Sequence, residues 1–178
     1  MNDTFLVHSG KRIAPLSPTA EQVCAADIAH ALSMICRGNG HYKHFYSVAQ
    51  HSINCALEAK ARGLSKRVQL ACLMHDGSEA YLGDIVRPLK KHLKFYLEIE
   101  EKMQACVYAR FGIGDLSEAE LAAVKEIDDA VLYHEFLVIN GHRFEGEEPI
   151  LYASLDFEEH APGVLEKQFR VLTEALEV

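Results

Sequence analysis

The dipeptide His75-Asp76 is the first feature of this chain that indicates chemistry. It ends an apolar helical pattern, RVQLACLMHD, where a charged carboxylate is costly to desolvate without a partner. A metal ion would be such a partner, because imidazole and carboxylate together suit Zn, Mn, Fe or Co. Adjacent helical residues point about 100° apart, so both can bind one ion only where the helix is ending. The glycine that follows, Gly77, fits that requirement.

Two further side chains are candidates to complete the site. His51 lies in the helical segment SVAQHSINCALEA, and Asp128 is an acid within the apolar pattern AVKEIDDAVL. Helical bundles build metal sites from inward-pointing ligands on separate helices. A single His-Asp pair is weak evidence, so the prediction of a metal site depends on the four residues taken together.

The elements that must position these residues are predicted to be almost entirely helical. Apolar residues at helical spacing and capping signals predict helices over 18–36, 46–61, from Ser65 through His75, 94–110, 117–140 and from 162 onward. The residues 5–7 and 11–13 predict a short N-terminal hairpin or extended arm. Strand signals are otherwise almost absent, and no linker or repeat is visible. We therefore expect an all-α fold, with residues 1–178 forming one helical-bundle domain.

Composition excludes several classes of function. Apolar residues make up 49% of the 178 residues, which is ordinary for a globular protein and unlike a disordered one. The net charge of -8 argues against binding nucleic acid or an anionic membrane. No apolar stretch approaches the roughly 20 residues of a membrane span, and no secretory signal is visible. Five cysteines without a C-x-x-C pair fit a reducing compartment, so we expect a cytoplasmic protein.

The order His51, His75-Asp76, Asp128 resembles the H…HD…D signature of the HD-domain phosphohydrolase superfamily. The runs DIAHALSMICR-x-x-GH-x-x-x-FYSVAQHS, LMHDGSEAYLGDIVRPLK and VKEID are similar to small phage- and prophage-associated HD hydrolases and to bacterial 5'-deoxynucleotidases. The resemblance covers about residues 10 to 136. It implies an all-α HD-domain bundle, one divalent metal ion and hydrolysis of a nucleotide phosphoester.

Carried over by position, the resemblance assigns a role to each candidate residue. The metal ligands are His51, His75, Asp76 and Asp128. Glu79 matches the acid that positions or deprotonates the attacking water, and Asp84 matches an aspartate beside the sugar or the nucleophile. Arg37 matches a phosphate-contacting arginine, and Lys90 lies where the family often has a basic residue.

Two departures from the family pattern affect these assignments. A second acid, Asp129, follows Asp128, so the fourth ligand could be either residue, although the helical pattern favours Asp128 as the inward one. In the 5'-deoxynucleotidases a tryptophan follows the arginine, where this chain has Gly38 and contains no tryptophan at all. Any stacking on the substrate would then fall to other rings, for which the candidates are Phe45, Tyr46 and Tyr81.

Several functions share this motif. The first expectation is a 5'-deoxynucleotidase acting on dNMPs; the alternatives are a dNTP triphosphohydrolase with the same site and a non-catalytic nucleotide-binding HD module. Binuclear relatives, including oxygenases, use further histidines between the HD pair and the last aspartate, where this chain has only His92. That shortage favours a mononuclear centre, with Mn, Co, Zn, Mg or Fe as its ion.

A small-molecule nucleotide is therefore the expected partner, without nucleic acid or membrane. We also expect a homo-oligomer, a dimer or larger. The last helix has an apolar stripe of Leu165, Phe169, Leu172 and Leu176 that would pack either between subunits or, as is more common for a helix, on its own core.

Overall fold

A short antiparallel hairpin begins the chain in the computed structural model, which describes residues 3–177. Strand β1 (Phe5–Leu6) pairs with β2 (Arg12–Ile13), so of the two predicted alternatives, hairpin or extended arm, the structure has the hairpin. Ile13 is fully buried, and the turn between the strands is bonded through Ser9 to the Asp27 carboxylate. The hairpin is therefore attached to the helical body at both its turn and its second strand.

The rest of the described chain is helical or irregular, which confirms the all-α prediction. The α-helices are α1 (Ala25–Met34), α2 (Val48–Ala61), α3 (Lys66–Met74), α4 (Glu79–Leu82), α5 (Arg87–Lys90), α6 (Lys94–Arg110), α7 (Glu118–Glu135) and α8 (Pro162–Leu176). Two 3₁₀ turns, η1 (Ala20–Gln22) and η2 (Arg37–Gly40), flank α1, and a π-helical turn, η3 (Phe136–Asn140), continues α7. None of these described helices is both long and apolar enough to cross a membrane.

The first helix is shorter than predicted at both ends. A turn at η1 follows Pro18, and the chain then runs extended through the buried Val23 before α1 begins. At its other end α1 stops at Met34, because Cys36 forms a β-bridge with Ser47. Extended pairing with the segment before α2 thus replaces the last helical turn, and it fixes the backbone on which Arg37 lies.

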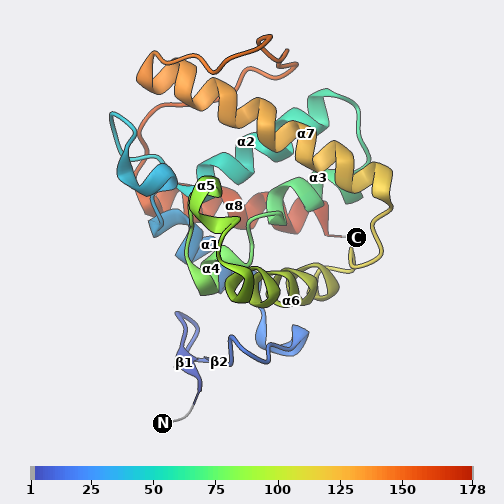
Figure 1. Cartoon of the computed structure of the whole chain (residues 1–178). Helices are drawn as coiled ribbons and strands as arrows, with labels where there is room; N and C mark the ends of the chain where they lie inside the picture. The colour runs from blue at the N-terminus through green and yellow to red at the C-terminus, as the bar shows by residue number, and fades with distance from the viewer. Residues whose placement is uncertain (1–2, 178) are drawn as a thin grey trace.

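Helix α2 is the centre of the molecule. Eleven of its fourteen residues are buried, and it packs against α1, α3, α7 and α8. In Figure 1, α7 runs along the top of the α2–α3 pair and α6 lies below it. Five of the eleven buried residues are nevertheless polar, and a polar side chain buried on such a helix needs a partner inside the protein.

The apolar stripe of α8 is part of this core. Leu165, Phe169 and Leu176 are buried, and Leu172 packs against the same cluster. Helix α8 contacts α1, α2 and α3 of its own chain. The alternative in which this stripe packs between subunits is therefore wrong, because the surface it needs is already covered.

Candidate metal centre and adjoining pocket

Four side chains from three parts of the fold converge on one point. His51 comes from the middle of α2, His75 and Asp76 follow the end of α3, and Asp128 comes from α7. The Nε2 atom of His51 lies 3.2 Å from Nε2 of His75 and 3.2 Å from Oδ1 of Asp128. Nε2 of His75 lies 3.3 Å from Oδ2 of Asp76.

The spacing of these donor atoms fits a single metal ion. Two further distances, from His51 to Asp76 and from His75 to Asp128, are both 3.8 Å. Ligand atoms about 2.1 Å from a tetrahedral zinc ion lie about 3.4 Å from one another. Nitrogen and carboxylate donors at this distance need a positive charge between them, which either a proton on an imidazole or a metal ion can supply.

The outer nitrogens of both histidines are already bonded. Nδ1 of His51 lies 2.6 Å from Oε1 of Glu135, and Nδ1 of His75 lies 2.7 Å from the Cys72 carbonyl oxygen. Because only acceptors face these atoms, each Nδ1 is assigned a proton, and each Nε2 faces the centre, where it can bind either a proton or a metal ion. This arrangement is the usual one for metal-binding histidines.

Glu135 was missed by the sequence analysis. Its fully buried carboxylate also accepts hydrogen bonds from Arg37 Nε at 3.2 Å and from the Tyr42 hydroxyl at 2.9 Å. Burial opposes its ionisation, but Arg37 and His51 together lower the pKa of the Glu135 carboxyl. The signal that could have identified it is an acid two turns after Asp128 on the same apolar face of the helix.

The structure also separates the two adjacent aspartates. Asp128 is 9% exposed and faces the centre, whereas the exposed Asp129 pairs with Arg87 and Lys125. Arg87 also bonds the Oδ2 atom of Asp128. The inward position of Asp128 agrees with the helical pattern, and its role as a ligand stays a prediction.

The charges of the centre favour a bound cation. Burial alone would lower the pKa of His75, but the carboxylates of Asp76 and Asp128 raise it well above its ordinary value. Burial would raise the pKa values of both aspartates, yet the neighbouring histidines lower them. Both carboxylates are therefore ionised at neutral pH. Asp76 also pairs through Oδ2 with Arg37 at 3.2 Å and Asp128 through Oδ2 with Arg87, so Oδ1 of Asp128 is the oxygen that faces the histidines without an arginine.

A thiol also borders the centre. The Sγ atom of Cys55 lies 3.5 Å from Nε2 of His51, so that His51, Cys55 and His75 could hold an ion in another combination. Burial, which is the main cause, raises the pKa of the Cys55 thiol well above its ordinary value. A protonated thiol is a weak ligand, so the two ionised carboxylates are the better partners for the histidines.

A cavity of about 590 Å³ opens beside the centre. It contains every predicted site residue except the two histidines. Its lining is formed by Arg37, Gly38, Tyr42, Asp76, Glu79, Asp84, Ile85, Val86, Arg87, Pro88, Lys90, Lys125, Asp128, Leu132, Phe136 and Phe144. The predicted substrate-binding and catalytic residues thus share one space with the two carboxylates of the centre.

Glu79 is the most unusual acid in this cavity. Its side chain is buried, with Oε1 3.4 Å from the Lys90 ammonium, while Oε2 has no hydrogen-bond partner within the described chain. Burial and the nearby charges of Asp76 and Asp84 raise the pKa of Glu79 well above its ordinary value. A buried oxygen without a partner is costly, which is expected where a ligand or water belongs.

Lys90 and Asp84 line the same cavity as Glu79. Lys90 donates to Glu100 at 2.7 Å as well as to Glu79, so it is held by two acids. Asp84 is half-buried, and burial raises its pKa although Arg37 opposes that change.

None of the rings proposed for stacking lies in this cavity. Tyr46 and Tyr81 are buried in the core, and Phe45 lines a separate surface depression beside Met34 and His160. The aromatic rings of the cavity are instead Tyr42, Phe136 and Phe144. Their ring centroids lie 4.9 Å apart for Tyr42–Phe136 and 5.1 Å apart for Phe136–Phe144, so the three form one continuous aromatic wall.

The backbone after Arg37 explains why a glycine stands there. Gly38 has a left-handed φ of 58°, and Asn39 has a φ of 52°. A side chain at position 38 would start 3.6 Å from the ring of Tyr42. That distance is an ordinary van der Waals contact, so the left-handed backbone is what favours glycine at position 38.

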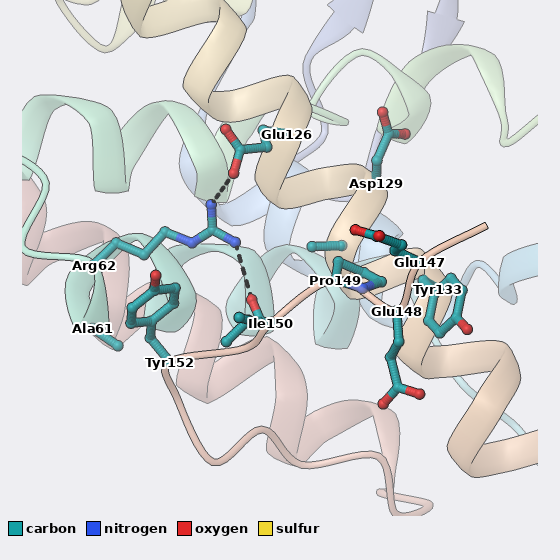
Figure 2. A pocket seen from close by; sticks show the side chains of 11 residues that line it. Ala61, Arg62, Glu126, Asp129, Tyr133, Glu147, Glu148, Pro149, Ile150 and Tyr152 are labelled. Atoms are coloured by element: carbon teal, nitrogen blue, oxygen red, sulfur yellow. Dashed lines mark hydrogen bonds and ion pairs between the residues drawn. The ribbon is translucent and has the colours of Figure 1, made fainter.

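A larger cavity, of about 840 Å³, lies away from the centre. Figure 2 shows its one arginine, Arg62, directed at Glu126 and at the Ile150 carbonyl oxygen. The remaining charged residues of its lining are the acids Asp129, Glu147 and Glu148. One basic side chain among four acids is a poor lining for an anionic substrate, whereas the smaller cavity has four basic side chains and adjoins the centre, so the smaller cavity is the candidate site.

Comparisons with known proteins identify relatives without indicating an activity. No protein-family model matches the chain. Over 126 residues it is 38% identical to an uncharacterized protein of Rhodobacter capsulatus, covering 67% of this chain and 64% of that protein. Over 105 residues it is 39% identical to the uncharacterized protein YfdR of Escherichia coli, covering 59% of this chain and 56% of that protein. The chain thus matches less than two thirds of the length of either relative.

Proposed function

We propose that this chain is an HD-domain phosphohydrolase that uses one divalent metal ion to hydrolyse deoxynucleoside 5'-monophosphates. The observation that supports it is the convergence of His51, His75, Asp76 and Asp128 beside a cavity that also contains Arg37 and Glu79. No activated serine or cysteine nucleophile takes part, so water is the nucleophile in this proposal.

The chain's own residues would hold and orient the metal ion. The two Nε2 atoms and the two carboxylates supply its ligands, and Glu135 and the Cys72 carbonyl oxygen hold the imidazole rings in place. When bound, such an ion acidifies a water molecule and polarises a phosphoryl oxygen. The ligand set suits Mn, Co, Zn or Fe, and Mg is also retained as a candidate.

Glu79 would act as the general base and then as the general acid of the reaction. Its Oε2 has no hydrogen-bond partner among the described residues, and its raised pKa makes the carboxylate a stronger base than an ordinary glutamate. A group of this kind can take a proton from the attacking water and pass it to the leaving sugar oxygen. Lys90 orients the other oxygen of Glu79.

Cations of the cavity would bind the phosphate. The protein carries a net charge of -8, but four basic side chains, Arg37, Arg87, Lys90 and Lys125, line this cavity. Guanidinium groups bind phosphate oxygens with good geometry. Asp84 is placed to meet the sugar, and the aromatic wall of Tyr42, Phe136 and Phe144 offers a surface for the base.

The first experiment measures phosphate released from a panel of dNMPs, NMPs and dNTPs. Purified protein is assayed with Mn, Co, Mg or Zn, and Asp76→Ala is the control. Orthophosphate from dNMPs, lost in the variant, is the expected result. Tripolyphosphate from dNTPs would move the protein to the triphosphohydrolases, and binding of metal and nucleotide without turnover under all conditions would favour a binding module.

Two adjacent aspartates provide a matched pair of variants. Asp128→Asn removes a ligand, so activity should fall by more than the roughly 10–100-fold typical of a residue that only supports one. Asp129→Asn also removes one negative charge, but at the neighbouring residue, which is exposed on α7. This variant should keep an activity close to that of the wild type. Equal losses in the two variants would contradict the assignment of the centre.

A further inference from the structure

A second group of metal-ligating side chains lies outside the candidate centre. His8 is in the turn between β1 and β2, His30 is on α1 and Glu166 is on α8. One ligand atom from each residue lies within 4.8 Å of the other two. These residues are far apart in the sequence, so only the folded chain brings them together.

The contacts within this group are close and specific. The rings of His8 and His30 are stacked, with centroids 3.7 Å apart and planes 14° from parallel. Nδ1 of His30 lies 3.0 Å from Oε2 of Glu166. The group is partly open to solvent, because His8 is exposed and the other two residues are only partly buried.

A buried anchor holds His8 over the helix. The next residue, Ser9, donates from its backbone N–H at 2.6 Å and from its hydroxyl at 2.8 Å to the carboxylate of Asp27. Asp27 is 2% exposed and lies about one turn before His30 on α1. The hairpin turn is therefore held against α1, and the stacking of His8 on His30 is a consequence of that anchoring.

We propose that His8, His30 and Glu166 bind a zinc ion that joins the N-terminal hairpin to α1 and α8. Two imidazoles and one carboxylate are an established donor set for zinc, with the fourth position left to water. The two rings would tilt out of their stack so that one nitrogen of each meets the ion. The ion would then cross-link the hairpin, α1 and α8. None of these three elements carries a ligand of the candidate metal centre.

This site is independent of the proposed phosphohydrolase activity. It shares no residue with the centre formed by His51, His75, Asp76 and Asp128. Loss of one site should leave the other able to bind metal, so failure of either proposal can be recognised separately.

In the test, the full chain is first stripped of metal and then dialysed to equilibrium against zinc. The number of zinc ions bound per chain is then measured. We expect about two ions per chain for the wild type and about one for His8→Gln, His30→Gln or Asp76→Ala. His92→Gln removes another exposed histidine and should retain both ions. Unchanged zinc content and affinity in both His8→Gln and His30→Gln would overturn the proposal.

A second measurement follows the hairpin itself. Trypsin can cleave after Lys11 and Arg12, both of which are exposed in the hairpin. If cleavage requires the hairpin to detach, zinc at ten times its dissociation constant should slow it about tenfold in the wild type and in Asp76→Ala. His8→Gln should gain no protection, and equal protection in that variant would contradict a zinc ion at the hairpin.

Discussion

At the scale of single residues, Glu135 connects the two halves of the candidate site. It bonds His51 of the metal centre through one oxygen, and Arg37 and Tyr42 of the cavity through the other. Because the carboxylate is fully buried and ionised, its orientation is determined by these three donors together. A change at Glu135 should therefore affect both the affinity for metal and the position of the phosphate-binding arginine.

Glu135→Gln is predicted to weaken metal binding by about 10–100-fold, the usual cost of losing the partner of a metal-binding histidine. Metal affinity is measured by competition with a chromogenic chelator, and circular dichroism checks that the variant is folded. Glu126→Gln, an exposed change on the same helix, is the control and should bind metal as the wild type does. Equal affinities in the two variants would show that Glu135 does not support His51.

Glu79 makes a pH-dependent contribution to stability. Its pKa in the folded protein is raised above the ordinary value of 4.5, so between these values the folded state binds more protons than the unfolded state. The contribution of Glu79 is therefore fully present below pH 4.5 and is lost as the pH rises through the folded pKa.

The metal-free Glu79→Gln variant is predicted to be more stable than the wild type at pH 8. At pH 5 the difference between their free energies of unfolding should be smaller. A glutamine has nearly the same shape and cannot ionise, so the cost of burying the charge disappears. Urea midpoints measured in EDTA at both pH values provide the test. The same variant should lose phosphohydrolase activity, and a stability difference independent of pH would contradict the raised pKa.

At the scale of the elements, the end of α3 is held against α6. A Cβ atom at Gly77 would lie 2.8 Å from Cγ1 of Val107 and 3.0 Å from the Met74 carbonyl oxygen. The glycine after His75-Asp76 is therefore required by the close approach of α6. This contact sets the direction of the chain where both metal ligands leave the helix.

Gly77→Ala is predicted to destabilise the protein by about 1–3 kcal/mol, the usual cost of forcing an extra group into a packed site. Chemical denaturation measures the loss. Gly163→Ala is the matched control, because a Cβ there meets no atom within 4 Å and the residue lies in the first turn of α8. That control should be neutral or stabilising, and a Gly77→Ala variant as stable as the wild type would show that Val107 can move aside.

At the scale of the whole molecule, the metal centre joins α2, the end of α3 and α7, which are separate in the sequence. An ion bound only by the folded state stabilises it, by about 2.7 kcal/mol at a concentration 100 times its dissociation constant. We predict this gain for the wild type with manganese, and no comparable gain for Asp76→Ala. Thermal unfolding of both proteins with and without manganese measures the difference, and an equal response would contradict the centre.

The expected homo-oligomer stays a prediction at this scale. The apolar stripe of α8 is buried within its own chain, so any subunit interface must use another surface. Light scattering of the purified protein measures the oligomeric state directly.

Local interactions explain what could be predicted from the sequence alone. The predicted bounds of α6 agree with the structure, α7 has the predicted capping box at Ser117, and α8 begins at Pro162 as expected. The N-terminal hairpin was one of the two predicted alternatives, the other being an extended arm. Helical periodicity and capping act between residues a few positions apart, so they can be read directly from the chain.

The tertiary structure decided what depends on distant residues. Glu135 and His51 are 84 positions apart, and no local pattern marks them as a pair. The aromatic wall likewise combines Tyr42 with Phe136 and Phe144, whereas the rings nearest the motif in sequence, such as Tyr46, are taken up by the core. The sequence determined the helices and the residue types available for chemistry. Long-range packing decided which of those side chains face one another, because burial of a polar group is tolerated only where the fold brings it a partner.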